Sequence, residues 1–405
     1  MSREQLLAYG YIVGVAFILS NGLILAIRKV ALAIGILDYP GAHKQHREPK
    51  PLLGGVAVFL ALLAVIGGHL AALPLLRQQE FARRLFPEVL AKFDTLALVL
   101  PTLWVILAGS VVVLITGLAD DLSGPRFPAW AKLIGQTIAA ALIVAAGVRV
   151  SLLEAYPWLA ALATLVWIVG ITNAFNLLDN MDGLATGVAL ICSLLLWLIT
   201  TALGEFYIGL FLSALIGALA GFLAHNFPPA RIFLGDAGSL LIGYVLGVIT
   251  VLASYVAPEE KIRNEWFAPF MPVIVLGLPL YDMASVIWIR WREGRPIYRG
   301  DRSHLSHRLV ELGMSEREAV GTIYLLTFCL GASALLLRDA TPMLTLLALG
   351  QVAGDHRRDD DPHGRAPSHE LRGDPPLFGA GWSSASHERF GIGAQPELLL
   401  DLSTA

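Results

Sequence analysis

The chain has 405 residues, of which 56% are hydrophobic and only 15% charged, and its net charge is −3. Soluble domains carry about 25% charged residues. Together with a mean hydropathy of +0.66, this composition excludes an ordinary water-soluble protein and indicates an integral membrane protein; no nucleic-acid partner is expected.

Apolar segments of membrane-spanning length follow one another along most of the chain. A helix of about 20 apolar residues crosses the hydrocarbon core. Such segments lie near 8–34, 54–76, 96–118, 130–150, 156–175, 184–203, 206–225, 236–256, 267–289 and 319–337, with a shorter run at 341–350. We predict an all-α, polytopic membrane helical bundle of about 10–11 transmembrane helices over residues 1–350.

The distribution of basic residues predicts the orientation of the bundle. Lys and Arg are more frequent in the loops after odd-numbered spans, and basic loops face the cytoplasm. We therefore expect the N-terminus outside and these loops inside. Residues 351–405 are rich in Asp, Arg, His, Pro, Gly and Ser, which predicts a disordered polar tail; a native extension and a shifted reading frame both remain open.

Nearly all polar motifs lie in the loops after odd-numbered spans, on one side of the membrane. In the first loop, Lys44, His46 and Lys50 could neutralise phosphate. Gly54 and Gly55 permit close backbone approach at a helix start, where N–H groups favour anions. An ordinary basic cytoplasmic loop is the alternative for this segment.

The second loop begins with adjacent carboxylates, Asp120 and Asp121, at the end of an apolar span. Such a pair suits metal or phosphate chemistry, and either member could serve as a general base. Carboxylates at a helix C-terminus oppose the helix dipole, so a purely solvated role is disfavoured. Lys132 lies about one turn into the next span and could reach the same site.

The third loop is the most polar segment between two spans. Two amides and two carboxylates recur every three residues: Asn173, Asn176, Asp179 and Asp182. Neighbours in such a row share a helical face, but the row drifts by about 60° per step on a straight helix. A break near Asn180 or Gly183 would let them converge. Oxygen ligands of this kind suit Mg²⁺, which also binds substrate phosphates.

The fourth and fifth loops add an acid and a basic cluster on the same side. Gly235-Asp236-Ala-Gly-Ser opens a span and leaves a carboxylate beside backbone N–H groups at a helix start. The fifth loop reads Asp-Arg-Ser-His-Leu-Ser-His-Arg-Leu over 301–309 and contributes Arg302, His304, His307 and Arg308. Guanidinium and imidazole groups suit diphosphate recognition, and metal binding by the two histidines is the alternative.

These five loops, in this order, resemble the polyprenyl-phosphate N-acetylhexosamine-1-phosphate transferase family. Asn-Ala-Phe-Asn-Leu-Leu-Asp-Asn-Met-Asp-Gly-Leu resembles the family's Asn-x-x-Asn-x-x-Asp-Gly-x-Asp-Gly signature, with Asn180 where Gly is usual. Leu-Ala-Asp-Asp and Phe-Leu-Gly-Asp-Ala-Gly-Ser resemble its paired-aspartate motif and metal-binding turn. The histidine loop has Ser306 where a third histidine is common. The resemblance covers about residues 35–330.

The resemblance implies a reaction and roles for these residues. A polyprenyl phosphate attacks the β-phosphate of a UDP-sugar donor, giving a lipid diphosphate-sugar and UMP, with Mg²⁺ required and Mn²⁺ as a substitute. Asp236 would ligate the metal. The catalytic set would be Asp120, Asp121, Asp179 and Asp182. Substrate contacts would come from Lys44, His46, Lys132, Asn173, Asn176, Arg302, His304, His307 and Arg308. Direct attack and a covalent aspartyl intermediate both fit.

The motif Asp-Arg-Ser-His resembles the branch that transfers GlcNAc-1-phosphate to undecaprenyl phosphate and so begins cell-envelope glycan synthesis. The alternative donors are UDP-MurNAc-pentapeptide, from which phospho-MurNAc-pentapeptide would be transferred, and other UDP-N-acetylhexosamines. The expected location is the inner (plasma) membrane, with a cytoplasmic active site, and a homodimer stays open. A secondary transporter of an anionic substrate is the remote alternative. Transporters place charges near the bilayer midplane, whereas the charges of this chain gather in loops on one side of the membrane.

Overall fold

The computed structural model describes residues 1–39, 49–153, 155–253, 270–296 and 303–338. The chain divides into two units, Met1–Gly350 and Gln351–Ala405, and the fold is that of the first. The predicted tail and the apolar run 341–350 lie outside the described residues. The helices are α1 Arg3–Ile34, α2 Gly54–Gln78, α3 Glu80–Leu85, α4 Pro87–Lys92, α5 Leu96–Ser123, α6 Ala129–Ala145, α7 Pro157–Leu178, α8 Leu184–Leu203, α9 Phe206–Asn226, α10 Gly235–Leu252, α11 Met271–Val275, α12 Gly277–Arg292, α13 Leu305–Glu311 and α14 Glu316–Arg338, with 3-10 turns η1 Phe93–Thr95, η2 Gly124–Arg126 and η3 Ser151–Leu153.

The prediction of an all-α membrane bundle is confirmed. Within the described ranges the strands are two short ones, β1 Leu37–Asp38 and β2 Lys50–Pro51, which pair antiparallel. Each of the ten predicted full-length spans contains helix, and eight helices of the described part are long and apolar enough to cross a membrane. The other two spans are shorter: α6 has 17 residues, and the ninth span is split into α11 and α12 at Leu276.

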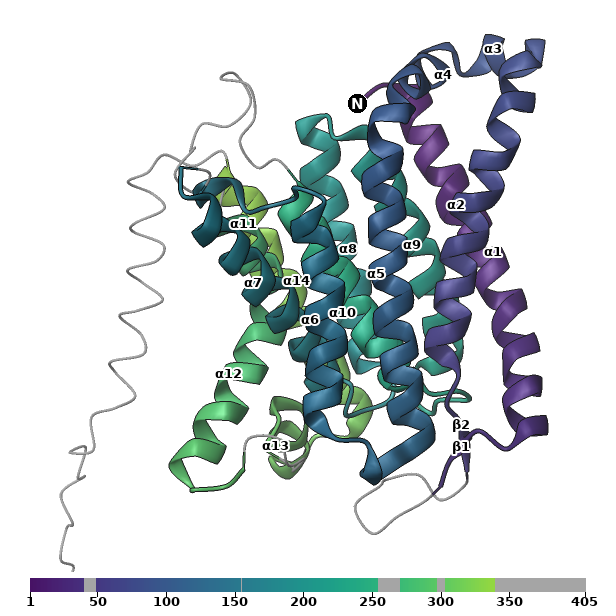
Figure 1. Cartoon of the computed structure of the whole chain (residues 1–405). Coiled ribbons are helices and arrows are strands. Elements are labelled where there is room, and N and C mark those ends of the chain that lie inside the picture. The colour runs from purple at the N-terminus through teal and green to yellow at the C-terminus, as the bar shows by residue number, and fades with distance from the viewer. Residues whose placement is uncertain (40–48, 154, 254–269, 297–302, 339–405) are drawn as a thin grey trace, which may run out of the picture. The chain divides into compact units, whose positions relative to one another are not determined.

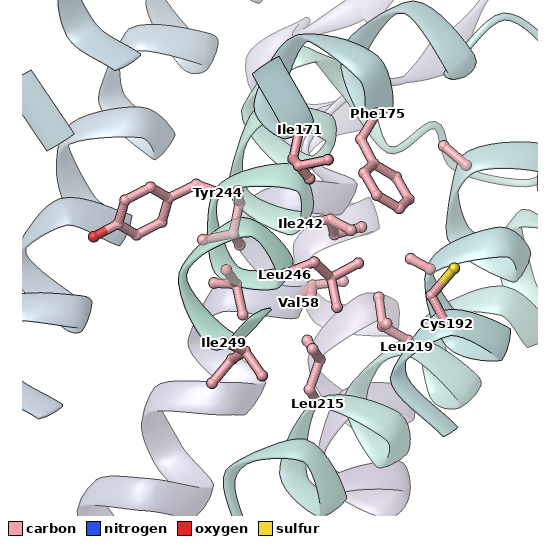
Figure 2. Packing of buried hydrophobic residues seen from close by; sticks show 14 of the residues in the cluster. Val58, Ile171, Phe175, Cys192, Leu215, Leu219, Ile242, Tyr244, Leu246 and Ile249 are labelled. Carbon is pink, nitrogen blue, oxygen red and sulfur yellow. The ribbon is translucent and has the colours of Figure 1, made fainter. Parts of the chain in front are cut away.

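Helix α10 lies at the centre of the bundle. It packs against α5 and α7, and also contacts α2 and α8. Figure 2 shows Ile242, Leu246 and Ile249 of α10 among side chains of the surrounding helices, and these three residues are at most 1% exposed. Outer helices such as α1 instead expose apolar side chains, for example Ile18 at 70%. This pattern suits a bundle whose outer helices face lipid. The close packing around α10 can hold the N-terminal end of that helix in place.

Most chain segments that carry polar motifs gather at one end of the bundle. Figure 1 shows α13 and the β1–β2 hairpin at the end of the bundle opposite to α3 and α4. The C-terminal end of α5 and the start of α10 meet through hydrogen bonds to Asp121. They are also at this polar end, because Asp121 and Asp236 line one cavity together with Asp38 of β1 and His307 of α13. The one-sided distribution expected from the sequence is therefore present in the fold.

The start of α2 approaches the loop before α10 closely, as its two glycines predict. The N–H of Gly54 donates to the carbonyl of Phe233 at 3.0 Å, and that of Gly55 donates to Leu234 at 2.9 Å. A Cβ added to Gly55 would lie 2.2 Å from the backbone of Gly238. The close approach is thus made to protein backbone, and these two N–H groups are not left for an anion, contrary to the expectation from the sequence.

Candidate active site

A single cavity of about 1070 Å³ collects residues from all five polar loops. Its walls are acidic. The lining includes Asp38, Asp120, Asp121, Asp179, Asp182, Asp236 and Glu316, against the basic side chains Lys50 and Arg317, with His307 on one wall. Seven carboxylates around one space repel one another unless cations are bound there. The cavity is therefore built to receive positive charge together with a ligand.

Lys132 joins two of the predicted acids. Its ammonium forms an ion pair with Asp120 of α5 and lies 3.0 Å from Asp236 Oδ2 at the start of α10. All three side chains are at least two-thirds buried. An ammonium between two carboxylates in a weakly solvated setting offsets their mutual repulsion. The sequence prediction that Lys132 reaches the acidic site is confirmed in its geometry.

The two asparagines of α7 have different partners. Asn176 donates to Asp236 Oδ1 at 2.5 Å and to Ser239 Oγ at 2.9 Å. Asn173, one turn earlier, exchanges hydrogen bonds with the buried amide of Gln136 on α6. Asn176 therefore orients the Asp236 carboxylate, whereas Asn173 makes a contact between helices. Neither asparagine is among the residues that line the cavity.

Asp121 has a structural partner that its position in the sequence does not reveal. Its two carboxylate oxygens accept the N–H groups of Asp236 at 2.8 Å and Ala237 at 3.1 Å. These are unpaired donors of the first turn of α10, which a carboxylate satisfies well. Gly235 makes room for it, because its φ is +73° and an added Cβ would lie 2.7 Å from an Asp121 oxygen. Asp121 thus positions Asp236.

The expected break in the third loop is present. Helix α7 ends at Leu178 and α8 begins at Leu184, and Gly183 between them has φ +74°. Asp179 and Asp182 both line the cavity, and Asp182 Oδ2 accepts the N–H of Ala230 from the loop before α10. Burial raises the pKa of Asp179 well above its usual range, and the Asp236 carboxylate raises it further. The break therefore turns the two acids toward α10.

The histidine loop is organised by an acid that was not among the predicted site residues. Asp282 of α12 accepts from His304 Nδ1 at 2.8 Å and from the N–H of Leu305 at 2.7 Å. Asp282 and His304 are 1% and 4% exposed. His304 is thus absent from the cavity lining and helps to hold the start of α13. A lone carboxylate inside an otherwise apolar predicted span was a signal that could have identified Asp282.

The remaining predicted substrate contacts have mixed outcomes. His307, one turn after His304, lines the cavity. Arg308 donates to Ser285 of α12 at 3.3 Å and is not among the lining residues. Lys44, His46 and Arg302 lie outside the described residues. Arg317 at the start of α14 lines the cavity although it was not a predicted site residue.

The donor set suits a hard cation that is completed by a ligand. Among the described residues, no three His, Cys, Asp or Glu side chains are gathered as a ready metal cage. Mg²⁺, however, usually takes only one or two carboxylates, with water and substrate phosphates filling the other positions. Asp236 and Asp120 provide carboxylate oxygens beside the amide of Asn176. The residues present therefore fit Mg²⁺ bound together with a phosphate ligand.

The fold and the site define a polytopic membrane protein with one acid-rich cavity at the polar end of its helical bundle. Residues 103–254 match the model of glycosyl transferase family 4. This range includes Asp120, Lys132, Asp179 and Asp236.

Full-length relatives extend this match. The chain is 31% identical over 347 residues to a probable undecaprenyl-phosphate N-acetylglucosaminyl 1-phosphate transferase of Bacillus subtilis, covering 83% of this chain and 87% of the relative. It is 34% identical to a decaprenyl-phosphate N-acetylglucosaminephosphotransferase of Mycobacterium tuberculosis, covering 74% and 75%. It is 26% identical to an undecaprenyl-phosphate alpha-N-acetylglucosaminyl 1-phosphate transferase of Yersinia pestis, covering 75% and 77%.

The chain belongs to the polyprenyl-phosphate N-acetylhexosamine-1-phosphate transferase family, within glycosyl transferase family 4. The resemblance inferred from the five loops is thereby confirmed. The protein is a multi-pass membrane protein and a sugar-phosphate transferase.

Proposed function

We propose that the protein transfers GlcNAc-1-phosphate from UDP-GlcNAc to undecaprenyl phosphate, releasing UMP. The lipid phosphate attacks the β-phosphorus of the donor, the bond from that phosphorus to the oxygen bridging the two phosphates breaks, and UMP leaves with that oxygen. The names of the relatives support both substrates. The observation that carries the proposal is the convergence of Asp120, Asp179, Asp182 and Asp236 on one cavity at the end of a membrane bundle.

We propose Mg²⁺ as the cofactor, with Mn²⁺ as a substitute. Phosphoryl transfer between two anions depends on charge neutralisation and in-line positioning more than on covalent chemistry. Asp236 would hold the ion, with Asp120 and the Asn176 amide beside it. When bound, the ion would offset the charge of the carboxylates and the donor phosphates. An excess of carboxylates over basic side chains on the cavity wall supports this assignment.

The protein's own residues would divide the remaining work. Lys132 holds Asp120 and Asp236 together and supplies a fixed positive charge. Asp121 uses both oxygens to hold α10, so Asp120 is the member of the pair better placed to accept a proton from the lipid phosphate. The cavity is also lined by His307, Lys50 and Arg317, which would contact donor phosphates.

We place the protein in the inner (plasma) membrane with the cavity on the cytoplasmic side. The bias of Lys and Arg toward loops at the polar end supports this orientation. A lipid substrate reaches the site laterally from the bilayer and a nucleotide sugar reaches it from water. A cavity at one end of the spans is where the two can meet.

The proposal is tested by UMP release from the purified protein with undecaprenyl phosphate and a panel of UDP-sugars. UDP-GlcNAc should give the highest rate, and the rate should disappear with EDTA and return with Mg²⁺. A preference for UDP-MurNAc-pentapeptide or another N-acetylhexosamine would keep the reaction and correct the donor.

The metal assignment has its own variant. Asp236→Ala should lower the rate at least about a hundredfold, because a charge placed where the reacting phosphates bind is lost. Asp94→Asn is the matched control, since Asp94 pairs with Arg77 and is not among the residues that line the cavity. Full activity of the Asp236→Ala protein with Mg²⁺ present would refute the assignment.

A further inference from the structure

Two loops that are far apart in sequence meet at a short hydrogen bond beside the cavity. The hydroxyl of Ser306 on α13 donates to Asn180 Oδ1 at 2.6 Å. The other end of the same amide donates from Nδ2 to the carbonyl of Leu177 at 3.0 Å, at the end of α7. The Asn180 amide is therefore held at both ends, with its oxygen directed at α13.

These are the two positions at which the chain departs from the motifs described above. In the resemblance given above, the motif has Gly at position 180 and often a third histidine at position 306, whereas this chain has Asn180 and Ser306. Since the two side chains contact each other, the departures form one physical unit. A glycine at 180 would remove the acceptor, and a histidine at 306 would need space beside the Asn180 side chain, because Ser306 is only 1% exposed.

The neighbours of the pair connect it to the cavity. Asn180 lies between Asp179 and Asp182, and all three line the cavity. Ser306 directly precedes His307, which lines the same cavity from α13. The hydrogen bond therefore joins the acidic turn after α7 to the helix that presents His307.

We propose that the Asn180–Ser306 hydrogen bond is a positioning device that sets the spacing between the acidic turn and His307, and through it the fit of the donor. The identity of the donor rests on the proposed function, but the contact does not. Asn180 and Ser306 are positioning residues, because they act through Asp179, Asp182 and His307.

The Asn180–Ser306 contact predicts that two substitutions, each damaging alone, compensate each other when they are combined. Asn180→Gly leaves a buried hydroxyl without its acceptor, and Ser306→His places an imidazole against the Asn180 amide. Each single variant should raise the KM for UDP-GlcNAc on the order of tenfold, as expected for the loss of a buried hydrogen-bond partner. In Asn180→Gly/Ser306→His the glycine makes room for the ring. The double variant should therefore have a lower KM than Ser306→His alone.

The experiment measures KM for UDP-GlcNAc, KM for undecaprenyl phosphate and the thermal unfolding midpoint for wild type, both singles and the double. The KM for the lipid should stay unchanged. Ser306→Thr keeps the hydroxyl and should keep the wild-type KM, whereas Ser306→Ala should not; these two variants decide the matter if Ser306→His does not fold. Ser333→Ala, at a half-buried serine of α14 that is not among the residues that line the cavity, is the matched control.

Several outcomes would overturn the proposal. The first is that the KM of the double variant equals the product of the separate effects of Asn180→Gly and Ser306→His. The second is a wild-type KM in Ser306→Ala. The third is that the unfolding midpoints of the two singles and the double are coupled while the KM for UDP-GlcNAc does not change. If wild type releases no UMP from UDP-GlcNAc, the proposed function fails, and the pairing is then decided by the unfolding midpoints. Additive midpoints would refute the pairing, and compensation in the double variant would support it.

Discussion

Two parts of the cavity wall are held in different ways. One is the Asp236 centre, which consists of Asp236 with Asp120 and Asp121, and the other is helix α13, which presents His307. The Asp236 centre rests on membrane-spanning helices in backbone contact, since a Cβ added to Gly117 of α5 would lie 2.5 Å from the backbone of Ala237 on α10. Helix α13 has seven residues. Its start is attached through side chains, with Asp282 and Ser285 of α12 on one side and Asn180 on the other.

The difference separates two kinds of function. Charges that must act on the reacting phosphates are placed on helices whose positions are over-determined by packing. The short helix that presents His307 packs against α14 and places Leu305 and Leu309 on the core. Its start is fixed by a few polar contacts, each of which a single substitution removes. We therefore expect changes at the Asp236 centre to affect the rate of the reaction, and changes around α13 to affect donor affinity.

After Asp236→Ala, the largest effect is expected for Lys132→Met. This change removes the ammonium that lies between Asp120 and Asp236 and leaves two largely buried carboxylates facing each other. The rate of UMP release should fall on the order of a hundredfold, with little change in the KM for UDP-GlcNAc. An effect confined to the KM would break the proposed division between the two regions.

The second effect concerns Asp121→Ala. The N–H groups of Asp236 and Ala237 lose their acceptor, which should lower the free energy of unfolding by about 2 kcal/mol and displace Asp236. Both the thermal midpoint in detergent and the rate of UMP release should fall. Loss of activity at an unchanged midpoint would instead assign Asp121 a direct chemical role.

A smaller effect is expected for Asp282→Asn. The amide can still accept one hydrogen bond but no longer offers a charge to His304, so α13 is held less firmly. The KM for UDP-GlcNAc should rise on the order of tenfold, while the rate at saturating donor stays within a few-fold of wild type. Ser285→Ala, which removes the contact with Arg308, should have the same direction and a smaller size. A large fall in the saturating rate would contradict the comparison.

The smallest expected effect concerns stability: in the absence of metal, the Asp179→Asn protein should be more stable than wild type. Because burial and the Asp236 carboxylate raise the pKa of Asp179, the unfolded chain releases this proton at lower pH than the folded protein. Asp179 therefore favours folding least at high pH, and stability is lost as pH rises from about 4 through the folded pKa. In EDTA, the midpoint of Asp179→Asn should exceed that of wild type at pH 7.5, and the difference should shrink toward pH 4. A difference that does not depend on pH would refute this account.

Much of the architecture follows from local sequence. Hydropathy determined the bundle and the eight long apolar helices of its described part, because a segment of about 20 apolar residues has one low-energy state in a bilayer. The order of polar loops determined that one end of the bundle carries the site. Gly183 and Gly235 marked two backbone turns correctly, since positive φ is a property of a single residue.

The partner of each polar side chain depends on how the helices pack together. Asp121 holds the start of α10, Asn173 pairs with Gln136, and His304 turns to Asp282. None of these contacts joins neighbours in sequence. Each depends on the rotation of one helix against another and on how closely their backbones approach, which hydropathy does not encode. For the same reason, two residues 126 positions apart, Asn180 and Ser306, are separate irregularities in the sequence and a single contact in the folded protein.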